Sequence, residues 1–176
     1  MHFHLGDDSI KYKLSNISSH VSVAYAILSN PEKRREYDKV LTIEPARLAA
    51  VQDKARSAFE EGRNYLSEKN YEDAERLLQK ATYYDASRSE YHYHYGLALA
   101  RQNKFREAEK EFESARRLEP HNVRYLTELG LVYLELGYPV RAKGLFEKAL
   151  SISPDNTSAA EGLKKIKDVR KHGEKK

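Results

Sequence analysis

The sequence predicts an all-α fold, a short solenoid of three helical hairpins, and two observations support this. The first is a gapless repeat of 34 residues, seen in the spacing of Gly62, Gly96 and Gly130. The second is the composition, since 8 Gly and 5 Pro in 176 residues leave few helix breaks, while 40% hydrophobic and 33% charged residues suit helices with solvated outer faces. A chain of this length holds one such solenoid and a small additional segment.

Five further positions repeat with the same period, and each has a packing reason. Small residues lie where two antiparallel helices cross closely, because overpacking such a contact costs about 1–3 kcal/mol. Large residues fill the space between one hairpin and the next. The positions are Tyr71, Phe105 and Pro139; Ala74, Ala108 and Ala142; Leu78, Phe112 and Phe146; Ala81, Ala115 and Ala149; and Ala86, Pro120 and Pro154.

Turn signals separate the expected helices. Residues 118–122 and 152–156 each place a proline before two polar residues, and Asn122 and Asn156 are positioned to cap the helix that follows. Pro139 suits the first turn of a helix, where its missing N–H costs nothing. Because a single hairpin cannot bury its apolar face alone, we expect the hairpins to stack.

This pattern resembles the tetratricopeptide repeat family, with units at residues 55–88, 89–122 and 123–156. The resemblance implies a right-handed solenoid in which the first helix of each hairpin lines a concave groove. One departure concerns the family's usual tryptophan position, which holds Ala58, His92 and Leu126.

Residues 157–176 are expected to form a capping helix and a basic tail. Ala160, Leu163 and Ile166 recur at helical spacing in this segment and are expected to face the stack. Such a helix would shield the open end of the third hairpin.

The N-terminal part of the chain holds a second pattern. Apolar residues recur there at helical spacing, at Ile17, Val21, Ala24, Tyr25 and Leu28. Residues 24–38, Ala-Tyr-Ala-Ile-Leu-Ser-Asn-Pro-Glu-Lys-Arg-Arg-Glu-Tyr-Asp, resemble the last two helices of the J-domain of DnaJ-type co-chaperones. A J-domain stimulates a DnaK-type chaperone through a His-Pro-Asp triplet, which this sequence does not contain.

The resemblance therefore implies a partial J-domain, derived from a longer co-chaperone, that does not itself activate a chaperone. We expect residues 1–41 to form this remnant and residues 42–54 a linker helix, ahead of the repeats at 55–156 and the segment 157–176. The apolar stripe lacks its usual partner helices, and leaving it in water forfeits about 25 cal/mol per Å2 of apolar surface. We expect it to pack on the repeats, to pair with a second copy or to be disordered.

The candidate binding site is the concave groove. In the family that the repeats resemble, positions 2, 5, 9 and 12 of each unit point into it. Apolar and aromatic residues at the middle, with arginines toward the edges, favour an amphipathic helix or an extended peptide as ligand. The candidate peptide-binding residues are Arg56, Phe59, Arg63, Tyr93, His94, Leu97, Arg124, Thr127, Leu131 and Leu134.

Some members of that family hold a chaperone's C-terminal carboxylates with a clamp of Lys, Asn and Arg at five positions. Those positions here hold Phe59, Arg63, His94, Arg124 and Glu128. Because Glu128 would repel a carboxylate, we expect no such clamp.

Charge and composition argue against other classes. From Glu161 onward seven Lys and Arg oppose three acids, which accounts for the whole net charge of +4 and leaves a near-neutral body without an electrostatic footprint for nucleic acid. No cysteine and no phosphate-loop or nucleophile motif is present.

His92 and His94 point in nearly opposite directions on a helix, so they cannot share a metal. His92 and Tyr95 are expected to be packing residues.

We therefore expect a non-enzymatic protein–protein interaction scaffold without a catalytic residue, cofactor or metal. Its partner would be a protein or peptide, with a DnaK-type chaperone only for a longer parent chain, and neither nucleic acid nor a membrane. No apolar run approaches the roughly 20 residues of a membrane span, and the N-terminus lacks a secretory signal, so a cytoplasmic location is expected. The alternative is a structural assembly module whose groove holds its own N-terminal segment or a second copy, as a homodimer.

Overall fold

A computed structural model describes the backbone of residues 5–173 and the side chains of residues 13, 15–26, 29–41 and 43–168. Within the backbone so described, every regular element is an α-helix. The helices are α1 (Leu5–Leu28), α2 (Pro31–Ser67), α3 (Tyr71–Tyr84), α4 (Ser89–Arg101), α5 (Phe105–Leu118), α6 (Val123–Glu135), α7 (Pro139–Ile152) and α8 (Thr157–Gly173). The chain divides into two compact units, residues 1–50 and 51–176, and α2 contributes to both.

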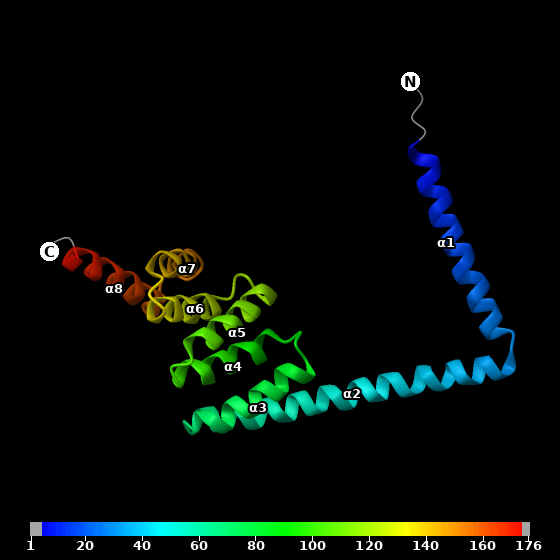
Figure 1. Cartoon of the computed structure of the whole chain (residues 1–176), viewed down its shortest axis with the longest axis horizontal. Helices are drawn as coiled ribbons and strands as arrows, with labels where there is room; N and C mark the ends of the chain where they lie inside the picture. The colour runs from blue at the N-terminus through cyan, green and yellow to red at the C-terminus, as the bar shows by residue number, and fades with distance from the viewer. Residues whose placement is uncertain (1–4, 174–176) are drawn as a thin grey trace. The chain divides into compact units, whose positions relative to one another are not determined.

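The second unit is a stack of helical hairpins (Figure 1). The last part of α2 pairs with α3, α4 pairs with α5, and α6 pairs with α7, while α8 packs on both α6 and α7. The predicted all-α, right-handed solenoid of three hairpins with a capping helix is confirmed. The division of the chain into residues 1–41, 42–54, 55–156 and 157–176 stays a prediction, and residues 42–54 lie inside α2.

The repeated glycines lie where the two helices of each hairpin touch, as the spacing predicts. A Cβ atom on Gly62 would lie 2.8 Å from Cγ of Leu78, and one on Gly96 would lie 2.8 Å from Cε1 of Phe112. The third hairpin repeats the arrangement with Gly130 and Phe146 at 2.5 Å. A methyl group does not fit at these distances, so glycine lets the large residue of the paired helix reach the backbone.

Each hairpin turn contains one residue in the left-handed conformation, and these residues are also spaced by the repeat. They are Lys69 and Asn103, each with φ of 61°, and Gly137 with φ of 77°. In the third turn Gly137 N–H donates to the Leu134 carbonyl and Tyr138 N–H to the Tyr133 carbonyl, at 3.0 and 2.7 Å. This is the Schellman pattern that ends a helix by satisfying its last carbonyls.

The predicted helix starts are confirmed. The Asn122 side chain accepts a hydrogen bond from the Arg124 N–H at 3.1 Å, and the Asn156 side chain accepts one from the Ala159 N–H at 2.8 Å. Pro139 is the first residue of α7. These contacts satisfy donors that a helix N-terminus otherwise leaves free.

The buried face of α8 differs by one residue from the prediction. Ala160 is exposed, whereas Ala159 is fully buried, Ile166 is buried and Leu163 is half-buried. Gly162 is the reason, because its missing side chain lets α8 lie against the ring of Phe146 from the side opposite Gly130. The inward face is therefore centred on Gly162, and the expectation for Ala160 was wrong.

Two clusters of buried side chains hold the solenoid together. The larger one joins α4 to α8 and includes Phe112, Leu129 and Phe146, while the smaller one joins α2, α3 and α4 and includes Phe59 and Leu78. Tyr95 on α4 packs against both clusters, as expected for a packing residue.

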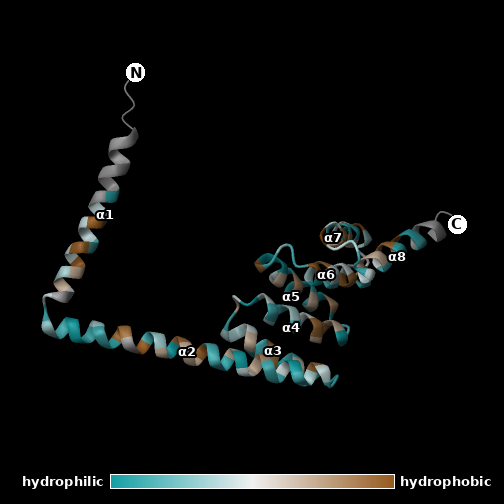
Figure 2. Cartoon of the chain, turned by 180° about the vertical axis from the view of Figure 1, so that it is seen from behind, coloured by the Kyte–Doolittle hydropathy of each residue, from teal (hydrophilic) through white to brown (hydrophobic). Residues whose placement is uncertain are grey.

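In the first unit, apolar side chains face solvent. Ile17, Val21 and Tyr25 of the stripe on α1 are 59, 62 and 74% exposed. The N-terminal part of α2 adds the exposed Val40 and Leu41, and Figure 2 shows such hydrophobic residues interleaved with polar ones along both helices. The side chain of Leu28, also assigned to the stripe, lies outside the described residues.

Candidate functional site

The ten predicted groove residues lie on α2, α4 and α6, and five side chains of the groove face form a row of ring contacts. The ring centres of Phe59 and His94 are 5.2 Å apart and those of His94 and Tyr93 are 5.1 Å apart, both edge to face. The Arg63 guanidinium lies 5.4 Å from the centre of the Phe59 ring. At the other end, the Arg124 guanidinium lies 5.5 Å from the centre of the Tyr93 ring. Cation–π attraction thus closes both ends of a row that crosses all three helices.

Three of the predicted residues offer little open surface. Phe59, Tyr93 and Thr127 are only 4, 7 and 5% exposed. The Thr127 hydroxyl donates to the Val123 carbonyl of its own helix at 2.8 Å. These side chains pack between the helices, since repeat spacing identifies the face of a helix but not how deeply each residue lies in it.

The remaining predicted residues are more open. The leucines at positions 97, 131 and 134 are half-buried, and Arg56, Arg63 and Arg124 are exposed. Arg56 pairs with Asp53 at 2.6 Å, an exposed contact of little energetic weight. Half-buried leucines beside exposed arginines leave surface for both apolar and charged contacts.

A basic hollow lies between α2 and α4. It has a volume of about 420 Å3, and its lining includes Arg63, Leu66, Lys69, His94, Leu97 and Arg101. Among its described lining residues there is no carboxylate. Arg63 has Glu60 at 3.6 Å, whereas no salt bridge within 4.0 Å is formed by Lys69 or Arg101 in the described chain.

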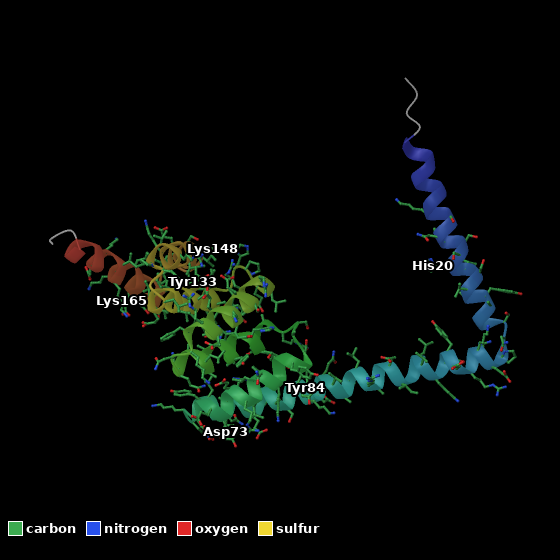
Figure 3. The ribbon with its side chains drawn as sticks, viewed as in Figure 1. His20, Asp73, Tyr84, Tyr133, Lys148 and Lys165 are labelled. Carbon is green, nitrogen blue, oxygen red and sulfur yellow. The ribbon has the colours of Figure 1, made fainter. Side chains whose placement is uncertain are left out.

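An apolar hollow of about 440 Å3 lies between α6, the start of α7 and α8. Its lining includes Leu131, Leu134, Glu135, Pro139, Lys165 and Ile166. Figure 3 labels Lys165 on α8 and Tyr133 on the neighbouring α6. The sequence predicted only a capping role for α8, yet α8 supplies Lys165 and Ile166 to this open surface.

A middle hollow of about 320 Å3 adjoins both of these. Its lining includes Arg101, Asn103, Phe105, Glu128, Leu131 and Glu135. It therefore shares Arg101 with the basic hollow and both Leu131 and Glu135 with the apolar hollow.

A fourth hollow, the acidic hollow, lies between α2, the N-terminal end of α4 and the C-terminal end of α5. It has a volume of about 580 Å3, and its charged lining comprises Asp53, Arg56, Glu60, Asp85, Arg88, Glu90 and Glu119. Several of these charges already pair, as in Arg56 with Asp53 and Arg88 with Asp85.

Burial shifts the pKa of both His94 and Glu128 on the groove face. It lowers the pKa of His94, whose Nδ1 lies 2.9 Å from the Glu90 carbonyl oxygen. Burial also raises the pKa of Glu128, against the opposing effect of Arg101. The charge of the basic hollow therefore comes from Arg63, Lys69 and Arg101, and the groove changes sign toward Glu128.

His92 has a structural role, as expected for a packing residue. Its Nδ1 lies 2.7 Å from Glu111 Oε2 and its Nε2 lies 3.1 Å from the Ala86 carbonyl oxygen. Both ring nitrogens face acceptors, so the doubly protonated imidazolium satisfies both contacts. The hydrogen bond to Glu111 raises the pKa of His92, aided by the Ala86 carbonyl and opposed by burial and by Arg117.

We expect Glu111→Gln to destabilise the protein more at about pH 5.5 than at about pH 8.5. A raised folded-state pKa means that the pair contributes its full stability below about pH 6.5, the ordinary histidine value, and loses it as the pH rises through the folded-state pKa. Urea unfolding at both pH values measures this difference. The control is Glu107→Gln on the exposed face of α5, and equal losses for Glu111→Gln at both pH values would contradict the expectation.

Over the described side chains, no three His, Asp or Glu residues are grouped to hold a metal ion. None of the described helices is long and apolar enough to cross a membrane.

Stacked helical hairpins with a hollowed face built by their first helices define a helical-repeat protein of the solenoid class. The family model that describes the tetratricopeptide repeat matches residues 59–104 and 96–157, together more than half of the chain. The chain belongs to the tetratricopeptide repeat family.

Solved structures share this fold. The Arabidopsis OM64 TPR domain has a TM-score of 0.64 at 21% identity, covering 69% of this chain and 98% of that one. The second TPR domain of human RPAP3, in complex with the HSP70 peptide SGPTIEEVD, has a TM-score of 0.62 at 24% identity, covering 68% of this chain and 98% of that one. The Yersinia enterocolitica type III secretion chaperone SycD, in complex with a peptide of the translocator YopD, has a TM-score of 0.61 at 15% identity, covering 67% and 95%. At these identities the likeness shows the fold alone.

A curated relative is the probable UDP-N-acetylglucosamine–peptide N-acetylglucosaminyltransferase SPINDLY of Solanum lycopersicum. It is 40% identical over 68 residues, which are 39% of this chain. The chain spans only 7% of that protein's length.

Proposed function

We propose that the chain is a non-catalytic protein-interaction module that binds a peptide or helical segment of another protein along its inner face. The observation that carries this is the series of adjoining hollows, the basic, middle and apolar ones, along the first helices of the hairpins. The peptide complexes of the similar domains of human RPAP3 and SycD support it.

In this proposal the predicted residues divide between two roles. Leu97, Leu131 and Leu134 supply apolar contact, because they line the hollows and are half-buried. Arg56, Arg63, His94 and Arg124 supply polar contact. The nearly buried Phe59, Tyr93 and Thr127 hold the helices that carry these contacts at a fixed spacing.

Derivation from a DnaJ-type co-chaperone belongs to the same proposal. It rests on the resemblance of residues 24–38 to the end of a J-domain and on the exposed stripe that a complete J-domain would cover. In such a parent, the repeats would hold a client while the J-domain recruits a DnaK-type chaperone. Because the His-Pro-Asp triplet is absent, the present chain would act as the holding part only.

The test is selection from a random peptide library against the full chain, with binding of the selected peptides measured by fluorescence anisotropy. Arg63→Glu and Leu131→Glu, at an exposed and a half-buried groove position, are expected to weaken binding about tenfold, or about 1.4 kcal/mol. The matched controls are Lys80→Glu and Val140→Glu, at exposed sites on α3 and α7. Thermal unfolding checks that each variant folds, and selected peptides that bind all four variants equally would refute the proposal.

A second candidate, self-assembly through the first unit, is favoured by the exposed Ile17, Val21 and Tyr25. Light scattering of the full chain decides between them. A dimer that Val21→Glu with Tyr25→Glu dissociates would favour assembly, and a monomer at all concentrations would favour the interaction module.

A further inference from the structure

The basic, middle and apolar hollows adjoin one another along the groove face. Arg101 lines both the basic and the middle hollow, and Leu131 and Glu135 line both the middle and the apolar one. The groove face therefore carries three adjoining hollows, in the order basic, middle and apolar, from α2 across α4 and α6 to α8.

The geometry points to a groove whose two ends differ in chemistry. Such a groove selects a peptide with a carboxylate side chain near one end, a large apolar side chain near the other and a basic side chain between them. This rests on the proposed function and names the chemistry of its ligand. Each of the three requirements follows from a different hollow.

The basic hollow requires the carboxylate. Lys69 and Arg101 have no carboxylate within 4.0 Å in the described chain, and Arg63 is only loosely paired with Glu60 at 3.6 Å. The leucines at positions 66 and 97 line the same hollow as these exposed cations. A ligand carboxylate placed there would form charge-assisted hydrogen bonds with them.

The middle hollow requires the basic side chain and argues against nucleic acid. Glu128 is half-buried, and Glu135 lines the same hollow about two turns further along α6. Two glutamates would repel the next phosphates of a chain whose first phosphate sat in the basic hollow. Arg101 also lines this hollow and offsets only one of the two charges, so a lysine or arginine of a peptide would compensate the other.

The apolar hollow requires the large side chain. Leu131, Leu134 and Pro139 supply apolar atoms from α6 and α7, and Ile166 adds them from α8. Burying a leucine or phenylalanine side chain there stabilises a complex by roughly 1.5–3 kcal/mol. The capping helix would thus act as a fourth inner helix of the binding face.

The experiment uses short synthetic peptides and the full chain. One carries Glu, Lys and Leu in that order and a second carries them in reverse, so that the preferred chain direction is found. In the better binder, Glu is then replaced by Lys, Lys by Glu, or Leu by Ser, and affinity is measured by fluorescence anisotropy. Each replacement is expected to weaken binding about tenfold.

Charge reversal in the protein supplies the decisive comparison. Arg101→Glu is expected to weaken binding of the original peptide about tenfold. The same substitution is expected to strengthen binding of the peptide whose Glu has become Lys. Lys80→Glu makes the same charge change on α3 away from the groove and is expected to alter neither affinity. For the apolar end, the peptide affinity of Leu134→Ser is compared with that of Val140→Ser, which changes an exposed site. Thermal unfolding checks that both variants fold.

The outcomes separate this inference from the proposed function. If each peptide replacement lowers affinity and the charge exchange between peptide and Arg101 restores it, both the inference and the proposed function are supported. Library peptides that bind the groove with no preference for this charge pattern would overturn the inference and leave the function standing. An oligonucleotide that binds as tightly as the peptide, with the same sensitivity to Arg101→Glu, would also overturn it.

Discussion

Truncating Phe146 to alanine is expected to lower the free energy of unfolding by about 3–5 kcal/mol. Phe146 on α7 is fully buried in the larger cluster. Its ring lies between two glycine backbones, those of Gly130 on α6 and Gly162 on α8. Three helices converge on this ring, so they cannot collapse onto the space that its loss would leave.

Urea unfolding followed by circular dichroism measures this effect. The matched control is Val140→Ala on the same helix, where the side chain is 73% exposed and the change should stay within about 0.5 kcal/mol. A loss below about 1 kcal/mol for Phe146→Ala would show that the three helices repack, contrary to the expectation.

Gly130→Ala is expected to destabilise the protein by about 1–3 kcal/mol, although alanine favours a helix over glycine by about 1 kcal/mol. The new Cβ atom would lie 2.5 Å from Cε1 of Phe146. Phe146 is fully buried, so its ring has no free space into which to move. Packing therefore outweighs helix propensity at this position.

Gly144→Ala is the control for that substitution. Gly144 is exposed on α7 and has no heavy atom within 4 Å of its potential Cβ position. Only the propensity effect remains there, so this change should stabilise the protein by about 0.5–1 kcal/mol. If both substitutions shifted the urea midpoint in the same direction, the packing role of Gly130 would be disproved.

The sequence predicted the hairpins because their packing depends on size at fixed spacing. Gly130 opposite Phe146 is one case, since the repeat reveals both partners and general helix geometry brings them together. The same reasoning placed Asn122 and Pro139 at helix starts, where the chemistry is local.

Other features depend on contacts that no periodicity reveals. The depth of Phe59 and Tyr93 follows from how neighbouring helices approach, so the repeat spacing places both on the groove face without showing that they are nearly buried. The one-residue shift on α8 arose from Gly162, whose partner Phe146 belongs to the hairpin before it. Glu128 and Arg101, which line one hollow, come from different repeats and share no motif.

The two buried clusters meet at Tyr95 and differ in size, so the two ends of the solenoid are expected to unfold at different temperatures. The cluster on the α2 side holds fewer large side chains than the cluster on the α8 side, and a stack of repeats opens from its weaker end. The basic hollow is built on α2 and α4, so it is expected to unfold at a lower temperature than the apolar hollow. A warmed molecule would then keep the middle and apolar hollows but lose the cations that the proposed ligand carboxylate needs, so this part of the proposed ligand preference would be more heat-sensitive than the fold itself.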